Sequence, residues 1–354
     1  MLHFHPLTIA DVRRECGDAI RVRFEVPSSL AGDFRFVQGQ HVSLRATVNG
    51  EELRRSYSIC SGLDDGELCV AIRNVPGGRF SSWACGAFER GMTVDVLPPE
   101  GRFFPVDVAS DGKHYVAFAA GSGITPVLSV ARTVLRREPH SRFTLVYGNR
   151  QVSTTLFLEE LEDLKDRYLG RFVLHTVFSR ELQDIELFNG RIDAAKVGAF
   201  AATLLPVDTI DEAFVCGPGG MIDEVESALA GLGLDPGRIH VERFGVPSGG
   251  EQHRREPADT AQAAIVIELD GVRRQIDFQP SDASILEAAL RAGLDLPFSC
   301  KGGMCCTCKG KVLEGKVRMD RNYSLDAADV ARGFVLTCQS HPLTDHVVLT
   351  YDER

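Results

Sequence analysis

The chain has 354 residues, of which 44% are hydrophobic and 25% are charged, and these globular values argue against a wholly disordered chain. Its length predicts two or three domains. With 39 basic and 49 acidic residues the formal net charge is −10, which argues against generic binding to nucleic acid or to an anionic membrane. The sequence has no predicted membrane span and no apolar signal-peptide core, so we expect a cytoplasmic protein.

The first hundred residues consist of short apolar runs that end in turn signals. Such runs lie at 20–26, 41–46, 68–72 and 93–97, and turn residues such as Asn49-Gly50 and Pro98-Pro99 separate them. Many short strands joined by turns predict an antiparallel barrel or sandwich. We also expect one short helix that begins near Ser81.

From Lys113 onwards, strand-like apolar runs alternate with helical patterns. The predicted strands are 115–120, 143–147, 172–178, 213–216 and 239–241, and the predicted helices are 126–137, 155–167, 193–203 and 221–232. This alternation predicts βαβ units and therefore a mainly parallel sheet.

A segment rich in Gly, Pro and charged residues follows, at 245–262, and it has no apolar periodicity. We interpret it as a flexible linker. Beyond it, alternating apolar residues, the turn Asp270-Gly271 and a helical stretch at 284–292 predict a small domain that opens with a hairpin. The predicted organisation is a β-barrel domain (1–106), an α/β domain (107–246), a linker (247–262) and an α+β domain (263–354).

Four of the ten cysteines lie within nine residues, and a fifth follows at position 338. The spacing Cys300-x4-Cys305-x2-Cys308, with the distant Cys338, is the plant-type arrangement of ligands for a [2Fe-2S] cluster. Small residues in this loop allow backbone N–H groups to approach the cluster. The strand 334–337 is expected to bring Cys338 to the site.

The alternatives at this site are structural zinc and reduced core cysteines. Zinc ribbons usually combine two C-x2-C knuckles, whereas this segment has one. We therefore expect iron and sulfur, with Cys306 as a packed thiol that is not a ligand. The stretches ILEAALRAGLDLPFSCKGGMCCTC and GFVLTCQSHPL resemble the plant-type ferredoxins over about 90 residues, which implies a β-grasp fold.

A glycine-containing turn, Gly121-Ser122-Gly123-Ile124-Thr125-Pro126, joins the first strand of the α/β segment to a helix. Glycines at such a junction let backbone amides approach a pyrophosphate at the helix N-terminus. A simple strand–helix turn is the alternative, because the pattern is not a full G-x-G-x-x-G. We take Gly121, Gly123 and Thr125 as candidate nucleotide contacts.

The ends of the next two strands carry cations in place of an acidic ribose partner. Arg150 follows the second strand, and Ser179 and Arg180 follow the third. Two arginines and a serine suit a 2′-phosphate, so we expect NADPH rather than NADH. The alternative for each arginine is a solvated loop charge.

Four short motifs occur in the order RSYS, GRFS, GSGITP and CGPGGM, and together they resemble the ferredoxin reductase superfamily. The resemblance implies FAD as the flavin. It implies that Arg55 neutralises a flavin phosphate, Tyr57 stacks on the isoalloxazine ring and Ser58 binds near N5. The other implied contacts are Gly78 and Ser81 (pyrophosphate), Phe244 (the second ring face), and Cys216 and Gly217 (nicotinamide side), with Ser58 and Cys216 on the hydride path.

The order flavin barrel, nucleotide domain and ferredoxin is that of oxygenase reductases. Segments such as GQHVSLRATVNGEELRRSYSIC, AAGSGITPVLS and HVERF resemble the reductase subunits of bacterial phenylacetyl-CoA 1,2-epoxidases. This implies transfer of electrons from NADPH through FAD and a [2Fe-2S] cluster to a di-iron oxygenase in aerobic phenylacetate degradation. The alternatives are a reductase for another oxygenase, such as an aromatic-ring hydroxylase, and a zinc-stabilised binding module.

Overall fold

The computed structural model describes residues 3–104, 111–245 and 256–353. The chain forms two compact units. The first comprises His5–Leu53 and Tyr57–Phe244, and the second is built on the strands that follow residue 255. Each unit is described separately below. None of the helices in the described ranges is long and apolar enough to cross a membrane.

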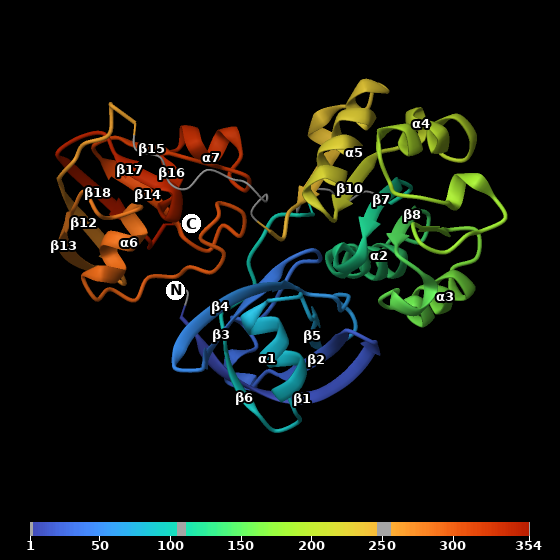
Figure 1. The fold of residues 1–354 in the computed structure, drawn as a ribbon, viewed down its shortest axis with the longest axis horizontal. Helices are drawn as coiled ribbons and strands as arrows, with labels where there is room; N and C mark the ends of the chain where they lie inside the picture. Colours follow the sequence, from blue (N-terminus) through green and yellow to red (C-terminus); the bar gives the residue numbers. More distant parts are fainter. Residues whose placement is uncertain (1–2, 105–110, 246–255, 354) are drawn as a thin grey trace. The chain divides into compact units, whose positions relative to one another are not determined.

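An antiparallel six-stranded sheet forms the N-terminal half of the first unit (Figure 1). Its strands are β1 (His5–Cys16), β2 (Ala19–Glu25), β3 (His41–Val48), β4 (Glu51–Ser58), β5 (Leu68–Arg73) and β6 (Thr93–Val96), in the order β4-β3-β6-β1-β2-β5. A bridge between Ile59 and Val70 joins the two outer strands, so the sheet closes on itself. Closure removes exposed strand edges, as the predicted barrel requires.

The barrel interior is filled by alternate side chains of its strands, among them Leu7, Ile9, Val22 and Leu44, which are fully buried. A 3-10 turn at Ser28–Leu30 and helix α1 (Arg79–Ala87) complete this part. Helix α1 begins at Arg79, two residues before the predicted start, and Gly78 is its N-cap residue.

A parallel five-stranded sheet forms the rest of the first unit. Its strands are β7 (His114–Ala120), β8 (Arg142–Asn149), β9 (Phe172–Phe178), β10 (Glu212–Cys216) and β11 (Ile239–Glu242), in the order β11-β10-β7-β8-β9. The connecting helices are α2 (Ile124–Arg137), α3 (Leu158–Arg167), α4 (Ala194–Thr203) and α5 (Gly219–Gly231). The strand order reverses at β7 and β10, and ligands of such sheets bind at this switch point.

The five predicted strands of this sheet are all present, whereas three helix starts differ from the prediction by two or three residues and that of α4 by one. Helices α2 and α5 each begin two residues earlier than predicted, at Ile124 and Gly219. Helix α3 begins three residues later, at Leu158. A 3-10 turn occupies Val152–Thr154, and Phe157 has a φ of 58°, so a continuous helix from residue 155 is not possible.

The second unit contains a mixed five-stranded sheet of order β13-β12-β18-β14-β16, packed against helix α6 (Ile285–Arg291). The strands are β12 (Ala263–Leu269), β13 (Val272–Phe278), β14 (Lys309–Glu314), β16 (Phe334–Leu336) and β18 (His346–Thr350). A two-stranded sheet pairs β15 (Val317–Met319) with β17 (Ser340–Pro342), and helix α7 spans Ala327–Ala331. The predicted hairpin at Asp270-Gly271 is confirmed by the β12–β13 pairing, and the predicted helix at 284–292 by α6.

Most of the predicted linker, together with the boundaries at 106/107 and 246/247, lies outside the described residues. Its C-terminal end is described and is anchored to the second unit. Asp259 accepts hydrogen bonds from Arg318 at 2.7 and 2.9 Å, and the Thr260 amide donates to Pro342 O at 2.9 Å. The Asp259 side chain is 2% exposed, and its buried charge is compensated by the guanidinium group of Arg318.

Candidate functional site

At the switch point of the parallel sheet, the backbone of the turn after β7 lies very close to the backbone at the end of β10. A Cβ atom on Gly123 would lie 2.1 Å from the carbonyl oxygen of Cys216, and one on Gly217 would lie 3.0 Å from Met221 Cε. The turn after β7 and the turn after β10 therefore pack without side chains between them. This arrangement leaves the predicted GSG and CGP motifs adjacent at the carboxyl ends of their strands.

One side chain that the sequence did not single out bonds to the glycine turn, and a second reaches it from the barrel. The hydroxyl of the fully buried Tyr147 donates to Gly121 O at 2.9 Å. From the barrel, Arg73 donates through Nη2 to Thr154 O at 2.5 Å, and its Nη1 lies 3.3 Å from the position of a Cβ on Gly121. Gly121 has a φ of 54°, which favours glycine. Thr125 is buried and donates to Ser122 O at 3.0 Å, which closes the first turn of α2.

A buried acid lies beside the predicted hydride-path residues. Ser58, at the end of β4, donates through Oγ to Glu242 Oε2 at 2.9 Å, and Glu242 is the last residue of β11. Cys216 pairs with Glu242 across the β10–β11 ladder and is fully buried. Burial raises the pKa of Glu242 to about 8 and raises the pKa of the Cys216 thiol well above its usual range. Ser58 and Cys216, 158 residues apart, thus lie around one carboxyl group.

The remaining predicted flavin contacts are distributed over the barrel surface. On β4, Arg55 is exposed and Tyr57 is half-buried, and the Tyr57 ring centroid lies 5.9 Å from that of Phe80. Alternation places Arg55 and Tyr57 on one face of the strand. At the start of α1, Ser81 Oγ accepts from the Val75 amide at 3.1 Å.

Glycine is favoured at position 78, because a Cβ there would lie 2.9 Å from the backbone carbonyl oxygen of Val75 and 2.5 Å from Ser81 Oγ. The amides that follow belong to the first turn of α1, where such groups have no partner within the helix. Phe244 follows β11 and is 46% exposed. A flat ring cofactor would cover an aromatic side chain of this exposure.

The predicted 2′-phosphate residues are brought together at the ends of β8 and β9. The Arg180 amide donates to Arg150 O at 2.9 Å, and the Ser179 amide donates to Asn149 O at 3.0 Å. The two arginine side chains are exposed, and within the described ranges neither forms an ion pair. Two unpaired guanidinium groups on adjacent strand ends are suited to an anion with several oxygens.

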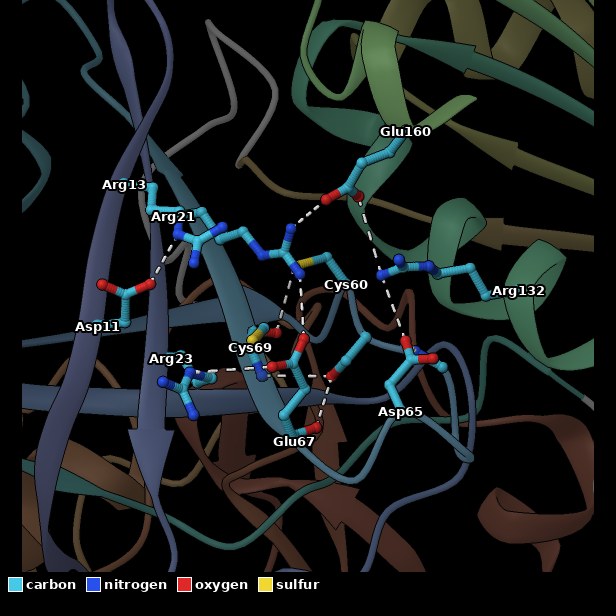
Figure 2. A network of polar contacts seen from close by, with 12 residues as sticks. Asp11, Arg13, Arg21, Arg23, Cys60, Asp65, Glu67, Cys69, Arg132 and Glu160 are labelled. Carbon is cyan, nitrogen blue, oxygen red and sulfur yellow. Dashed lines mark hydrogen bonds and ion pairs between the residues drawn. The ribbon is translucent and has the colours of Figure 1, made fainter. Parts of the chain in front are cut away.

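A network of charges joins the barrel to the nucleotide-binding half (Figure 2). Arg21 of β2 forms ion pairs with Glu67 at 3.1 Å and with Glu160 of α3, and Arg132 of α2 pairs with Asp65 at 3.2 Å and with Glu160 at 3.8 Å. Burial, the largest single effect, lowers the pKa of Arg21, but the Glu160 carboxylate and the neighbouring Cys60 and Cys69 together outweigh it, so the pKa is raised. Within this unit, the network fixes α2 and α3 against the barrel.

The cysteine loop of the second unit presents its predicted ligands as two pairs of thiols. The amides of Gly302 and Cys305 point at Cys300 Sγ, at 3.3 and 3.4 Å. A hydrogen bond from the Cys305 thiol and these backbone amides lower the pKa of Cys300 to about 5. The neighbouring thiol of Cys338 and burial raise the pKa of Cys308.

The four thiols fall into two pairs, which is the arrangement that a two-iron cluster requires. In the described ranges, no group of three or more His, Cys, Asp or Glu side chains is placed to hold one metal ion. A two-iron cluster takes two ligands on each iron. The pairs Cys300–Cys305 and Cys308–Cys338 fit that requirement.

Backbone conformation explains how the loop winds. Lys301, Gly303 and Cys306 all have positive φ, at 51°, 79° and 61°. A Cβ on Gly303 would lie 3.1 Å from Arg321 O, so this position needs glycine on two grounds. Cys306 is half-buried beside the core of the second unit.

The fourth predicted ligand lies on a 3-10 turn, Thr337–Gln339, directly after β16. Gln339 joins this turn to the loop, because its Nε2 lies 2.9 Å from Lys301 O and 3.7 Å from Cys338 Sγ. Sequence reasoning missed Gln339, and it also missed Glu242, Tyr147 and Arg73. All four act across long separations in the chain, and the one signal for Glu242 was its place at a predicted strand end.

Comparisons with known proteins agree with this division of the chain. Family models match residues 6–104 (oxidoreductase FAD-binding domain), 118–227 (oxidoreductase NAD-binding domain) and 267–343 (2Fe-2S iron-sulfur cluster binding domain). Phthalate dioxygenase reductase, a solved structure, has the same fold, with a TM-score of 0.60 and 23% identity over 98% of both chains. The zinc interpretation is not supported by these matches.

Two curated relatives span the chain. It is 46% identical to a subunit of the 1,2-phenylacetyl-CoA epoxidase of Escherichia coli (strain K12), over 100% of this chain and 99% of that protein. It is 34% identical to the ferredoxin reductase component of the 3-ketosteroid-9-alpha-monooxygenase of Rhodococcus rhodochrous, over 98% and 96%. The chain belongs to the family of oxygenase reductase components that join an FAD-binding, an NAD-binding and a [2Fe-2S] domain in one oxidoreductase.

Proposed function

We propose that this protein passes electrons from NADPH to the oxygenase of a phenylacetyl-CoA 1,2-epoxidase. The observation that carries this proposal is the 46% identity, over the whole chain, to a subunit of that enzyme from Escherichia coli. When bound, FAD accepts a hydride and the cluster carries single electrons, so the chain converts a two-electron donor into a one-electron donor. The protein's own contribution is to position both groups and the nucleotide.

The residue roles in this proposal follow from the geometry of each turn. The amides after Gly78 and those after Gly121 would hold the pyrophosphates of the flavin and of the nucleotide. Arg55 would neutralise a flavin phosphate, and Tyr57 and Phe244 would contact the ring. Arg73, which reaches the glycine turn from the barrel, would add a cation there.

At the reacting centre, Ser58 and Cys216 would face the hydride path, and Glu242 would hold a proton beside Ser58. The preference for NADPH would come from Ser179 and Arg180, with Arg150 assisting. The cluster would be held by Cys300, Cys305, Cys308 and Cys338. We propose the domains 1–106, 107–246 and 263–354, with a linker at 247–262.

Reconstitution tests the oxygenase partner. Purified reductase is mixed with the oxygenase subunits of a phenylacetyl-CoA epoxidase, and NADPH consumption and epoxide formation are measured with phenylacetyl-CoA. We expect both, and we expect neither with Cys308→Ser, which retains the flavin half. Coupled turnover with a 3-ketosteroid monooxygenase but not with the epoxidase would instead support the second candidate, a reductase for another oxygenase, which the 34% identical relative suggests.

The proposed domain division is tested by truncation. A protein that ends at Phe244 should bind FAD and reduce ferricyanide with NADPH but should not support the oxygenase, because that acceptor takes electrons through the cluster. Efficient turnover of the oxygenase by this truncated protein would contradict the proposed electron path.

A further inference from the structure

Next to the Ser58–Glu242 pair lies a histidine to which the proposed reaction assigns no role. His41, the first residue of β3, places Nδ1 at 3.9 Å from Glu242 Oε1, while Ser58 Oγ lies 2.9 Å from the other oxygen, Oε2. The His41 side chain is 8% exposed and that of Glu242 is 16% exposed. The carboxyl group thus accepts a hydrogen bond from a hydroxyl on one oxygen and has an imidazole nitrogen 3.9 Å from the other.

The surroundings of Glu242 offer few other titratable groups. From β10 the Cys216 thiol faces it, and burial keeps that group protonated. From β4 it receives the Ser58 hydroxyl, which does not titrate. The backbone of Glu100 is joined to that of His41, with N–O distances of 2.8 and 2.9 Å. On its own strand, His240 pairs with Glu212 at 2.8 Å, and Arg243, the residue after the strand, pairs with Asp223 at 2.6 Å.

The chemistry of the proposed reaction requires a proton to leave this region. Oxidation of NAD(P)H to NAD(P)+ yields two electrons and one proton, and the electrons alone pass on to the one-electron acceptor. The proton must therefore move to a group that can take it. A serine hydroxyl can relay a proton but cannot hold one, whereas a carboxylate and an imidazole can.

We propose that His41 is the positioning residue whose charge, 3.9 Å from the carboxyl group, lets Glu242 take up and release the proton that NAD(P)H oxidation yields. The inference rests on the proposed function of this site. A buried carboxyl group with no cation beside it holds its proton tightly and does not release it readily. An imidazolium beside it favours the ionised form, so Glu242 can receive a proton through Ser58 and release it again.

The test compares His41→Gln and His41→Phe with the wild-type holoprotein. We expect the midpoint of the pH profile for NADPH-dependent ferricyanide reduction to rise by about one unit or more, since loss of an opposing charge at 4–6 Å typically shifts a carboxyl by that amount. FAD content should not change. His140→Gln, which removes a surface histidine that faces Asp111, should leave the profile unchanged.

A second readout does not depend on turnover. The carboxyl C=O stretch of Glu242, identified by infrared difference against Glu242→Gln, should titrate in the wild type in step with the His41 imidazole observed by NMR, as a coupled pair. In His41→Gln the carboxyl step should move to higher pH. Independent titration of the two groups in the wild type, or an equal loss of rate at every pH in the variants, would overturn the proposal. Failure of the oxygenase assay affects neither readout, because ferricyanide takes its electrons from the flavin half.

Discussion

Gly123 and Cys216 lie so close together that no side chain fits between them, since a Cβ on Gly123 would meet Cys216 O at 2.1 Å. The two residues end neighbouring strands, β7 and β10, at the point where the strand order reverses. The glycine of the GSG turn is therefore needed for packing, in addition to any contact of its amide with a phosphate. This contact joins the turn after β7 to the turn after β10.

We expect Gly123→Ala to separate these turns. Its dissociation constant for NADPH should rise by at least about tenfold, because a misplaced binding group weakens every contact made by the turn. Isothermal titration of the holoprotein measures this. The matched control is Gly198→Ala in helix α4, where a Cβ has open space and alanine should stabilise the fold by about 0.5–1 kcal/mol. Unchanged NADPH binding in Gly123→Ala would contradict the packing argument.

The cluster ligands are predicted to be Cys300, Cys305, Cys308 and Cys338. Serine at any one of the four should lower iron and sulfide content and bleach the visible spectrum of the cluster. Cys306→Ser is the control in the same loop and should retain full iron. If Cys306→Ser lost the cluster while one of the four variants kept it intact, the assignment would fail.

Arg180 is predicted to select NADPH. Arg180→Ala should raise KM for NADPH by about 10–150-fold and change KM for NADH little, since a hydrogen bond to a charged group contributes roughly 1.5–3 kcal/mol. Arg150→Ala should show the same direction with a smaller effect. Steady-state kinetics with both nucleotides measures this. An equal rise in KM for NADPH and for NADH would contradict a role of Arg180 in selecting NADPH.

The Arg21 network is predicted to stabilise the first unit. Arg21→Met leaves Glu67 and Glu160 without their central cation, and we expect the free energy of unfolding to fall by about 1–3 kcal/mol, less than for a fully buried pair because the carboxylates are about one quarter exposed. The control is Arg13→Met, which removes an exposed pair with Asp11 and should change stability by less than about 0.5 kcal/mol. Urea unfolding of both variants provides the comparison.

The stability of the folded protein is predicted to depend on pH through the carboxyl group of Glu242. Its pKa in the folded protein is about 8, above the usual value of 4.5, so between these values the folded state holds a proton that the unfolded state has lost. Stability from this group is therefore complete below about pH 4.5 and declines as the pH rises towards 8. Glu242→Gln should flatten this decline and be relatively more stable than the wild type at pH 8.5. If the stability of Glu242→Gln fell with rising pH as much as that of the wild type, other groups would be the cause of the decline.

The order of elements and the cofactor motifs could be predicted from the sequence alone. The alternating runs from residue 113 gave all five strands of the parallel sheet, because their periodicity is local. The spacing of Cys300, Cys305 and Cys308 likewise depends on one short loop. The starts of α1, α2, α3 and α5 differed by two or three residues, since single residues such as Phe157 decide where a helix can begin.

Tertiary structure alone decided which distant residues share a site. Ser58 and Glu242 are 184 positions apart, and the pattern around each gives no sign of the other. The sequence predicts that Tyr147 is a buried strand residue. Its hydroxyl donates to Gly121 O because β7 and β8 are adjacent and parallel. Local periodicity and spacing determine elements and motifs, whereas the partners of a buried polar group depend on how strands are ordered, and that order is set by packing of the whole domain.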